Sequence, residues 1–200
     1  MGISSKSLRG AAGLASVALA WACTAVPAVA AEAASATLSS TEISPTSWQY
    51  SLTLNDTGTT DIGTLWFAWV PGENFMSSAP TNTTSPSSWT ARTTHGGSTD
   101  GYAIQWVAGS GAALTPGQSV TGFTFDSSMS PQQMAGNSPL YPNTPVLTSF
   151  VYGGGPFSDA GVQFVVQTTP VPEPSSLALM GFGLLAVVAR AARRRVSTGA

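Results

Sequence analysis

The sequence Ser47-Trp-Gln-Tyr-Ser-Leu-Thr-Leu-Asn55 alternates polar and apolar residues without a break. Successive side chains of a β-strand point to opposite faces of a sheet. Trp48, Tyr50, Leu52 and Leu54 therefore share one face, and the serine, glutamine and threonine residues between them share the other. One apolar and one polar face indicate a half-buried strand of an antiparallel sheet.

Six further segments around this strand are rich in β-forming residues and are bounded by turn residues. They span residues 37–44, 62–70, 102–108, 119–125, 146–152 and 161–168. In the segment 119–125, Phe123 and Phe125 are expected to point inward, and Gly122 to mark a bulge or close packing. We predict an all-β domain, an antiparallel β-sandwich of about seven or more strands, with a closed barrel as the alternative.

Two polar regions interrupt these strands. Residues 73–101 are rich in Ser, Thr, Pro and Gly and predict a long loop region, in which Trp89 either lies in the loop or belongs to a short strand at 88–93. Residues 127–145 contain four prolines and predict a loop with at most one short helical turn. The segment 62–70 is apolar on both faces, so it is either covered on both sides or exposes an aromatic face.

The N-terminal 30 residues have the three parts of a secretory signal. Lys6 and Arg9 precede an apolar stretch over residues 10–26, and Ala28-Val29-Ala30 forms an A-x-A cleavage site. We therefore predict a signal helix that signal peptidase removes after Ala30. The alternative, a lipoprotein acylated at Cys23, is disfavoured because the bulky Trp21 lies where such signals prefer small residues.

The charge of the chain is unevenly distributed. Between residues 31 and 170, Arg92 is the only basic residue and eight residues are acidic, which gives this part a net charge of about −7. An acidic domain repels phosphate backbones, so the composition argues against nucleic-acid binding. The single cysteine lies in the leader, so the exported domain has neither a disulfide nor thiol chemistry.

The C-terminal tail has three parts of its own. Pro172, Glu173 and Pro174 precede an apolar run over residues 177–189, and an arginine cluster follows at Arg190, Arg193, Arg194 and Arg195. The uncharged run from residue 175 to 189 would span about 22 Å as a helix, against a bilayer core of about 30 Å. We predict a transmembrane helix that serves as a transient membrane stop. Because basic residues stay on the cytoplasmic side, the C-terminus is expected inside and the β-domain outside.

This tail resembles the PEP-CTERM sorting signal of bacteria. The resemblance lies in Pro172-Glu173-Pro174, the short hydrophobic helix with glycines at its centre, and the terminal arginines; an ordinary tail anchor is the alternative. It implies recognition by an exosortase-type membrane protease and an association with exopolysaccharide and biofilm matrix. The middle of the chain, at residues 63–69 and 149–161, also resembles sandwich domains found before such tails, which implies a fold but no activity. The expected domains are a signal peptide at 1–30, a β-sandwich at 31–170 and a sorting signal at 171–200.

Few residues suggest catalysis. His95 is the only histidine and has no motif around it, so a serine triad with Asp100 would need partners that the sequence does not indicate. The acidic residues are dispersed and form neither a calcium loop nor an evident glycosidase pair. We therefore expect a non-enzymatic protein without a cofactor or metal, and we rank a secreted hydrolase below the other hypotheses.

The tryptophans support a second functional hypothesis. Aromatic rings in a sandwich either form the core or present a platform on which sugar rings stack. Trp66 and Trp69 lie in the two-faced apolar segment and Trp89 in the long polar region, so these three are the candidates for sugar stacking. The sequence thus predicts an exported protein of the cell envelope or extracellular matrix, and the alternative is a carbohydrate-binding module.

Overall fold

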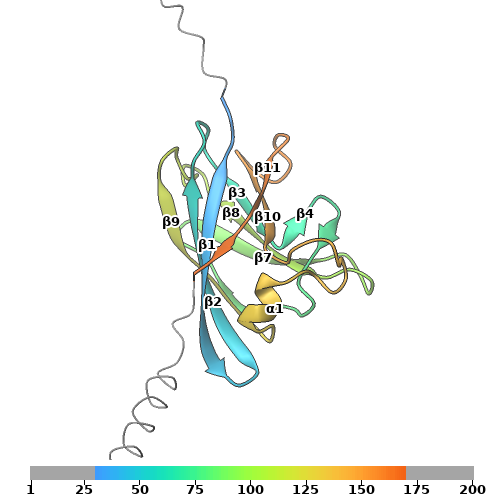
Figure 1. Cartoon of the computed structure of the whole chain (residues 1–200). Helices are drawn as coiled ribbons and strands as arrows, with labels where there is room; N and C mark the ends of the chain where they lie inside the picture. Colours follow the sequence, from blue (N-terminus) through green and yellow to red (C-terminus); the bar gives the residue numbers. More distant parts are fainter. Residues whose placement is uncertain (1–29, 170–200) are drawn as a thin grey trace, which may run out of the picture.

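The computed structural model describes residues 30–169, which fold into two packed five-stranded β-sheets, a separate two-stranded sheet and one short helix (Figure 1). The first sheet has the order β12-β1-β2-β9-β6 and the second the order β11-β10-β3-β8-β7. The bounds are β1 Ala34–Ser44, β2 Ser47–Asp56, β3 Thr64–Phe67, β4 Trp69–Val70, β5 Glu73–Asn74, β6 Thr81–Thr84, β7 Trp89–His95, β8 Tyr102–Ala108, β9 Ser119–Ser127, α1 Pro131–Ala135, β10 Thr148–Tyr152, β11 Val162–Val165 and β12 Gln167–Thr168. These sheets confirm the predicted β-sandwich; all pairings are antiparallel except that β12 lies parallel to β1.

The alternating segment Ser47–Asn55 lies in β2, at the centre of the first sheet. Its apolar residues Tyr50, Leu52 and Leu54 are at most 1% exposed, as the alternation predicted. β9 pairs with β2, and the register shifts by one residue between the partners of Leu52 and Leu54. The shift lies beside Gly122, which has φ +98°, so the predicted bulge is confirmed.

The core lies between the two sheets. Its largest fully buried side chains come from both of them, and they include Tyr50, Leu54, Phe67, Trp106, Phe123 and Phe125. Phe125 joins the layers, because its ring lies 5.1 Å from Tyr50 in its own sheet and 5.2 Å from Phe67 in the other. Aromatic burial of this kind contributes strongly to the stability of a small domain.

The region from 73 to 101 is more ordered than the sequence predicted. Instead of a long loop it contains β5, β6 and β7. β7 begins at Trp89 and confirms the alternative of a short strand at 88–93. β6 and β7 are edge strands whose residues are mostly exposed, so they lack the apolar alternation on which the prediction relied. Their backbone pairing with β9 and β8 determines their structure.

Two predicted strands are divided in the structure. The segment 62–70 breaks at Ala68, whose φ of +57° separates β3 from β4. The segment 161–168 begins as β11 on the second sheet and ends as β12 on the first, with Val166 buried between them. The chain therefore leaves the described part of the molecule from the edge of the first sheet.

The one helix agrees with the expectation of a single helical turn after residue 127. Pro131 occupies its first turn, and Ser130 and Gln133 form a capping box. The helix lies beside the hairpin of β1 and β2 (Figure 1).

The predicted signal helix and transmembrane helix lie outside the described residues. Within residues 30–169, no helix is both long enough and apolar enough to cross a bilayer.

Candidate functional site

The outer face of the second sheet carries a cluster of aromatic side chains, which we call the outer aromatic cluster. β3 turns Leu65 and Phe67 toward the core and Trp66 away from it. Likewise, β10 turns Val151 toward the core and Phe150 and Tyr152 away from it. The cluster is formed by Trp66, Trp69, Phe150, Tyr152 and Phe157. It is separate from the core between the sheets.

The left-handed backbone at Ala68 brings the two tryptophans together. Residues three apart in a regular strand would lie on opposite faces, but the break lets Trp69 stack on Trp66 with 3.7 Å between ring centroids. Trp66 and Trp69 are 4% and 5% exposed. The Nε1 group of Trp66 is buried and has no hydrogen-bond partner within the described part of the chain. Of the two outcomes that the sequence allowed for segment 62–70, the structure therefore shows the covered one, because most of the surface of both rings is buried.

Phe157 covers the tryptophan pair from a loop. Its ring is 64% exposed and lies 5.2 Å from Trp66 and 5.9 Å from Trp69, in edge-on contacts. Its φ of +62° is unusual for a residue with a side chain. Phe157 is thus the exposed member of the cluster. The sequence did not indicate it, because it follows Gly153-Gly-Gly-Pro156, which predicts only a break between strands.

Asp159 fixes the loop that carries Phe157. Its carboxylate accepts hydrogen bonds from the backbone N–H of Gly153 at 3.0 Å, from that of Gly161 at 2.8 Å and from the Ser158 hydroxyl at 2.8 Å. Partial burial alone would raise the pKa of Asp159, but these hydrogen bonds outweigh it and lower the pKa.

Glu32 connects this loop to the start of the domain. Burial and the negative charge of Asp159 raise the pKa of Glu32 above its ordinary value. Burial and the same two carboxyl groups also raise the pKa of Tyr152. The side of the cluster that faces residue 32 is therefore acidic.

Trp89, the third predicted stacking residue, lies away from the other two. It is 7% exposed and belongs to the core, where its ring meets Phe123 at 5.3 Å edge to face. Its Nε1 group donates to the carbonyl oxygen of Ala112 at 3.1 Å. Trp89 therefore lies in the core between the sheets and not in the outer aromatic cluster.

His95 and Asp100 do not form a catalytic pair with each other. The His95 ring stacks on Tyr102 at 4.3 Å, and its Nδ1 lies 2.8 Å from the carbonyl oxygen of Gly101. Asp100 accepts hydrogen bonds from the backbone and side chain of Asn74, from the Gly101 N–H and from the Tyr141 hydroxyl. Burial acts to raise the pKa of Asp100, and these hydrogen bonds lower it below the ordinary value. The two side chains stabilise the strand ends around them.

Potential metal ligands do not cluster in the described range. Among residues 30–169, no three His, Cys, Asp or Glu side chains lie close enough together to hold an ion.

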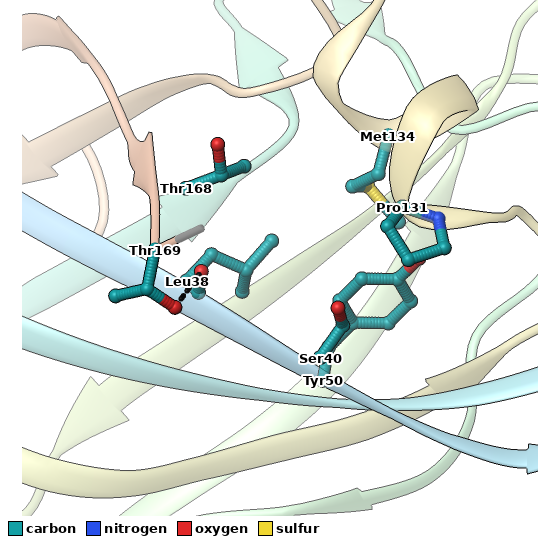
Figure 2. A pocket seen from close by; sticks show the side chains of 7 residues that line it. All are labelled: Leu38, Ser40, Tyr50, Pro131, Met134, Thr168 and Thr169. Atoms are coloured by element: carbon teal, nitrogen blue, oxygen red, sulfur yellow. Dashed lines mark hydrogen bonds between the residues drawn. The ribbon is translucent and has the colours of Figure 1, made fainter. Parts of the chain in front are cut away.

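A second feature lies where the chain leaves the sandwich. Figure 2 shows a pocket of about 140 Å³ between the end of β12 and helix α1, lined by Leu38, Ser40, Tyr50, Pro131, Met134, Thr168 and Thr169. The Tyr50 hydroxyl donates to the carbonyl oxygen of Met129 at 2.7 Å, which fixes the ring in the pocket wall. The sequence did not indicate this pocket, because its walls combine the β1–β2 hairpin with α1 and the end of β12, which lie far along the chain from it.

The predicted targeting residues lie at the ends of this domain. Ala30 is the first described residue and is exposed. The Ala31 N–H donates to the Thr59 hydroxyl at 2.8 Å. Ala28, Pro172, Glu173, Pro174, Arg190, Arg193, Arg194 and Arg195 lie outside the described residues.

Comparison with known proteins identifies the tail. The family described as the PEP-CTERM protein-sorting motif matches residues 170–195. The chain therefore carries this motif directly after its β-rich domain, and the resemblance seen in the sequence is confirmed. The motif implies an exported protein that is sorted by an exosortase. No curated protein matches the sequence.

Among solved structures, the similarities are distant. The GH20 exo-β-N-acetylglucosaminidase of Vibrio harveyi is 14% identical over 68% of this chain and 18% of its own length, with a TM-score of 0.35. The chitin-binding domain of Chi18aC from Streptomyces coelicolor is 26% identical over 64% of this chain and 97% of its own, with a TM-score of 0.32. A protein from Nocardia farcinica with an immunoglobulin-like fold is 12% identical over 66% of this chain and 99% of its own, with a TM-score of 0.35. This chain spans 18% of the length of the glucosaminidase.

Proposed function

We propose that this chain is a non-enzymatic protein of the cell envelope or extracellular matrix, associated with exopolysaccharide or biofilm. In this proposal signal peptidase removes residues 1–30, and the tail holds the precursor in the membrane with the β-sandwich outside. An exosortase-type protease then cuts at or near Pro172-Glu173-Pro174. The observation that carries the proposal is the sorting motif at 170–195, which begins one residue after the last described residue of the sandwich.

The location of the protein in cells tests this proposal. We expect the wild-type chain in the envelope or matrix fraction, and a variant with Pro172, Glu173 and Pro174 replaced by alanine in the membrane fraction. Ser175→Ala with Ser176→Ala is the matched control, because it alters the neighbouring residues and leaves Pro172, Glu173 and Pro174 in place. The proposal fails if the motif variant distributes as the wild type does.

A carbohydrate-binding role is the second candidate, and the exposed ring of Phe157 favours it. An aromatic side chain that is 64% exposed above two tryptophans offers an apolar surface against which a sugar ring packs. Phe157 would make the first contact, and Trp66 and Trp69 would form the platform beneath it. The acidic surroundings of Glu32 and Asp159 favour a neutral or basic polysaccharide over an acidic one.

Tryptophan fluorescence separates this candidate from the first. If the domain binds the host's own polysaccharide, titration changes the emission of Trp66 and Trp69, and Phe157→Ala weakens binding by about tenfold, or about 1.4 kcal/mol. Leu140→Ala is the control, because Leu140 is a 40% exposed apolar residue outside the cluster. An unchanged spectrum at saturating polysaccharide removes the carbohydrate hypothesis and leaves the sorting proposal intact.

A further inference from the structure

The outer edge of β1 is paired over only a short length. β12 pairs with it at Thr37 and Leu38, in parallel. Within residues 30–169, no strand pairs with this edge from residue 39 to the end of β1 at Ser44. Unpaired edges expose backbone N–H and C=O groups that readily accept another strand.

Beyond Leu38, the unpaired backbone N–H and C=O groups of β1 point to the same side as the groups that bond to β12. The Thr169 N–H donates to the carbonyl oxygen of Leu38 at 2.9 Å, so Leu38 directs its backbone groups away from β2. In an antiparallel pair such as β1 and β2, this direction alternates from residue to residue. Ser40 and Glu42 therefore direct their groups outward as well, and the register with β2 stays regular as far as Glu42.

The pocket lies along this edge, just beyond the end of β12. In Figure 2, Thr168 and Thr169 stand on one side of it and Pro131 and Met134 on the other, with Ser40 and Tyr50 between. Its volume of about 140 Å³ is close to that of an engineered cavity of about 150 Å³ that admits a benzene ring. A proline ring is smaller than benzene with its hydrogens, so this pocket has room for one.

The sequence after Thr169 has prolines in the right phase to continue β12. In a parallel ladder, every second residue of the added strand directs its N–H to the neighbour. Since Thr169 does so, Val171 and Glu173 would follow, toward the carbonyl oxygens of Ser40 and Glu42. Pro170, Pro172 and Pro174 fall at the positions whose N–H would face solvent, which is where an edge strand tolerates proline. If residues 170, 172 and 174 instead directed their backbone nitrogens toward β1, each proline would remove one hydrogen bond of the ladder.

We propose that residues 170–174, which contain the Pro-Glu-Pro motif, dock along the free edge of β1 as a continuation of β12. Partner residues in a parallel pair share a face, so Pro170 lies beside Ser40 and its ring enters the pocket against Tyr50, Pro131 and Met134. This is strand addition to an open edge by a segment of the same chain.

Docking has a consequence for sorting, and this consequence rests on the proposed function. A motif bound to the sandwich is withheld from the protease, because the protease must take the segment off β1 before it cuts. Docking also leaves only Ser175 and Ser176 between the sandwich and the predicted membrane helix. The domain thereby regulates the processing of its own tail.

Engineered cysteines test the docking in the full-length precursor. Extending the register pairs Thr41 with Val171, so Thr41→Cys with Val171→Cys places the two Cα atoms about 5 Å apart, within disulfide range. Gln49 lies opposite Thr41 on β2, so Gln49→Cys with Val171→Cys is the matched control at about 10 Å, beyond that range. Cys23→Ser is present in both, and the precursors are held in membranes of cells that lack the exosortase.

Disulfide formation distinguishes a docked tail from a free one. We expect rapid disulfide formation in the Thr41 pair and at least about tenfold slower formation in the Gln49 pair, a difference of about 1.4 kcal/mol. Equal rates in the two variants overturn the docking proposal. In membranes that contain the protease, the closed Thr41 disulfide is expected to slow cleavage, and reduction to restore it. Equal cleavage of the oxidised and reduced forms overturns the regulatory role.

The sorting proposal has a separate readout in the same experiment. If no variant is cleaved when reduced, the proposed function fails. Even if no variant is cleaved, faster disulfide formation in the Thr41 pair than in the Gln49 pair supports docking.

Discussion

The two sheets of this sandwich differ on their outer faces. The first sheet presents short polar side chains, such as Thr37 and Ser39 on β1 and Gln49 and Ser51 on β2, all of them exposed. The second sheet presents the outer aromatic cluster, of which only Phe157 is largely exposed. The first sheet therefore has one buried face, whereas the second sheet has two. The outer face of the second sheet is covered by loops, and the strands of that sheet do not determine where those loops lie.

Removal of a core side chain gives the largest expected effect, because it damages the interface that both sheets share. Phe125→Ala deletes a ring that is 0% exposed and contacts both Tyr50 and Phe67. We expect a loss of about 3–5 kcal/mol in the free energy of unfolding, measured by denaturant titration of the domain. A loss below about 1 kcal/mol would mean that the sheets do not pack on this ring.

Gly161 tests how closely the loop of Phe157 fits the second sheet. It has φ +58°, and an added Cβ would overlap the Phe150 ring and lie 2.6 Å from the carbonyl oxygen of Val151. Gly161→Ala is expected to cost about 2–4 kcal/mol from backbone strain and overpacking together. Gly122 in the first sheet also has a positive φ, +98°, but an added Cβ there would make only ordinary van der Waals contact with Pro86, at 3.6 Å or more. Gly122→Ala should therefore cost only the strain, about 1–2 kcal/mol. Equal losses would show that overlap with the cluster contributes nothing.

Asp100 tests whether side-chain hydrogen bonds hold the end of the second sheet. Asp100→Asn weakens bonds to Asn74, Gly101 and Tyr141 and is expected to cost about 1–3 kcal/mol at pH 7. The lowered pKa of Asp100 means that its stabilisation is present above the unfolded pKa of about 4 and is lost as pH falls through the folded pKa. Urea titrations at pH 7 and below pH 3 should therefore differ between variant and wild type only at the higher pH. Asp61→Asn, an exposed carboxylate, is the control, and a loss that persists at low pH would contradict the assignment.

Phe157→Ala is expected to have the smallest effect on stability, below about 1 kcal/mol, because most of the ring is already in water. Its effect on fluorescence should be clear, since Trp66 and Trp69 lose the ring that covers them. We expect a red-shifted emission and easier quenching by iodide. An unchanged spectrum would mean that Phe157 does not cover the tryptophans.

The contrast between the sheets also explains how far the sequence could predict the fold. β2 was predicted with its observed faces, because it alternates around one buried side. β8 was predicted from the same alternation, although the structure buries residues on both of its faces. β6 was missed, and β7 was predicted only as an alternative at 88–93, because edge strands of threonine and other exposed residues have no apolar period. Their position depends on pairing with β9 and β8, which no local pattern records.

The candidate sites were predictable only in part, for a related reason. Trp66 and Trp69 were identified because a strand that is apolar on both faces needs other residues to cover its second face. That cover, Phe157, comes from a loop some 90 residues later, which Asp159 holds in place through backbone N–H groups. For Trp89 the sequence left a loop and a short strand open, and the structure has the strand, which begins in the core. The sorting motif was predictable in full, since a membrane protease recognises it as a continuous segment of the chain.

The mass of the mature exported chain tests the central claim of this account most directly. Intact-mass spectrometry of protein recovered from the envelope or matrix should give a chain that begins at Ala31 and ends at or near Pro174. Such a product has lost all four terminal arginines and retains the acidic sandwich. A recovered chain that still extends through Arg195 would contradict the claim that the sandwich is released by cleavage at its sorting motif.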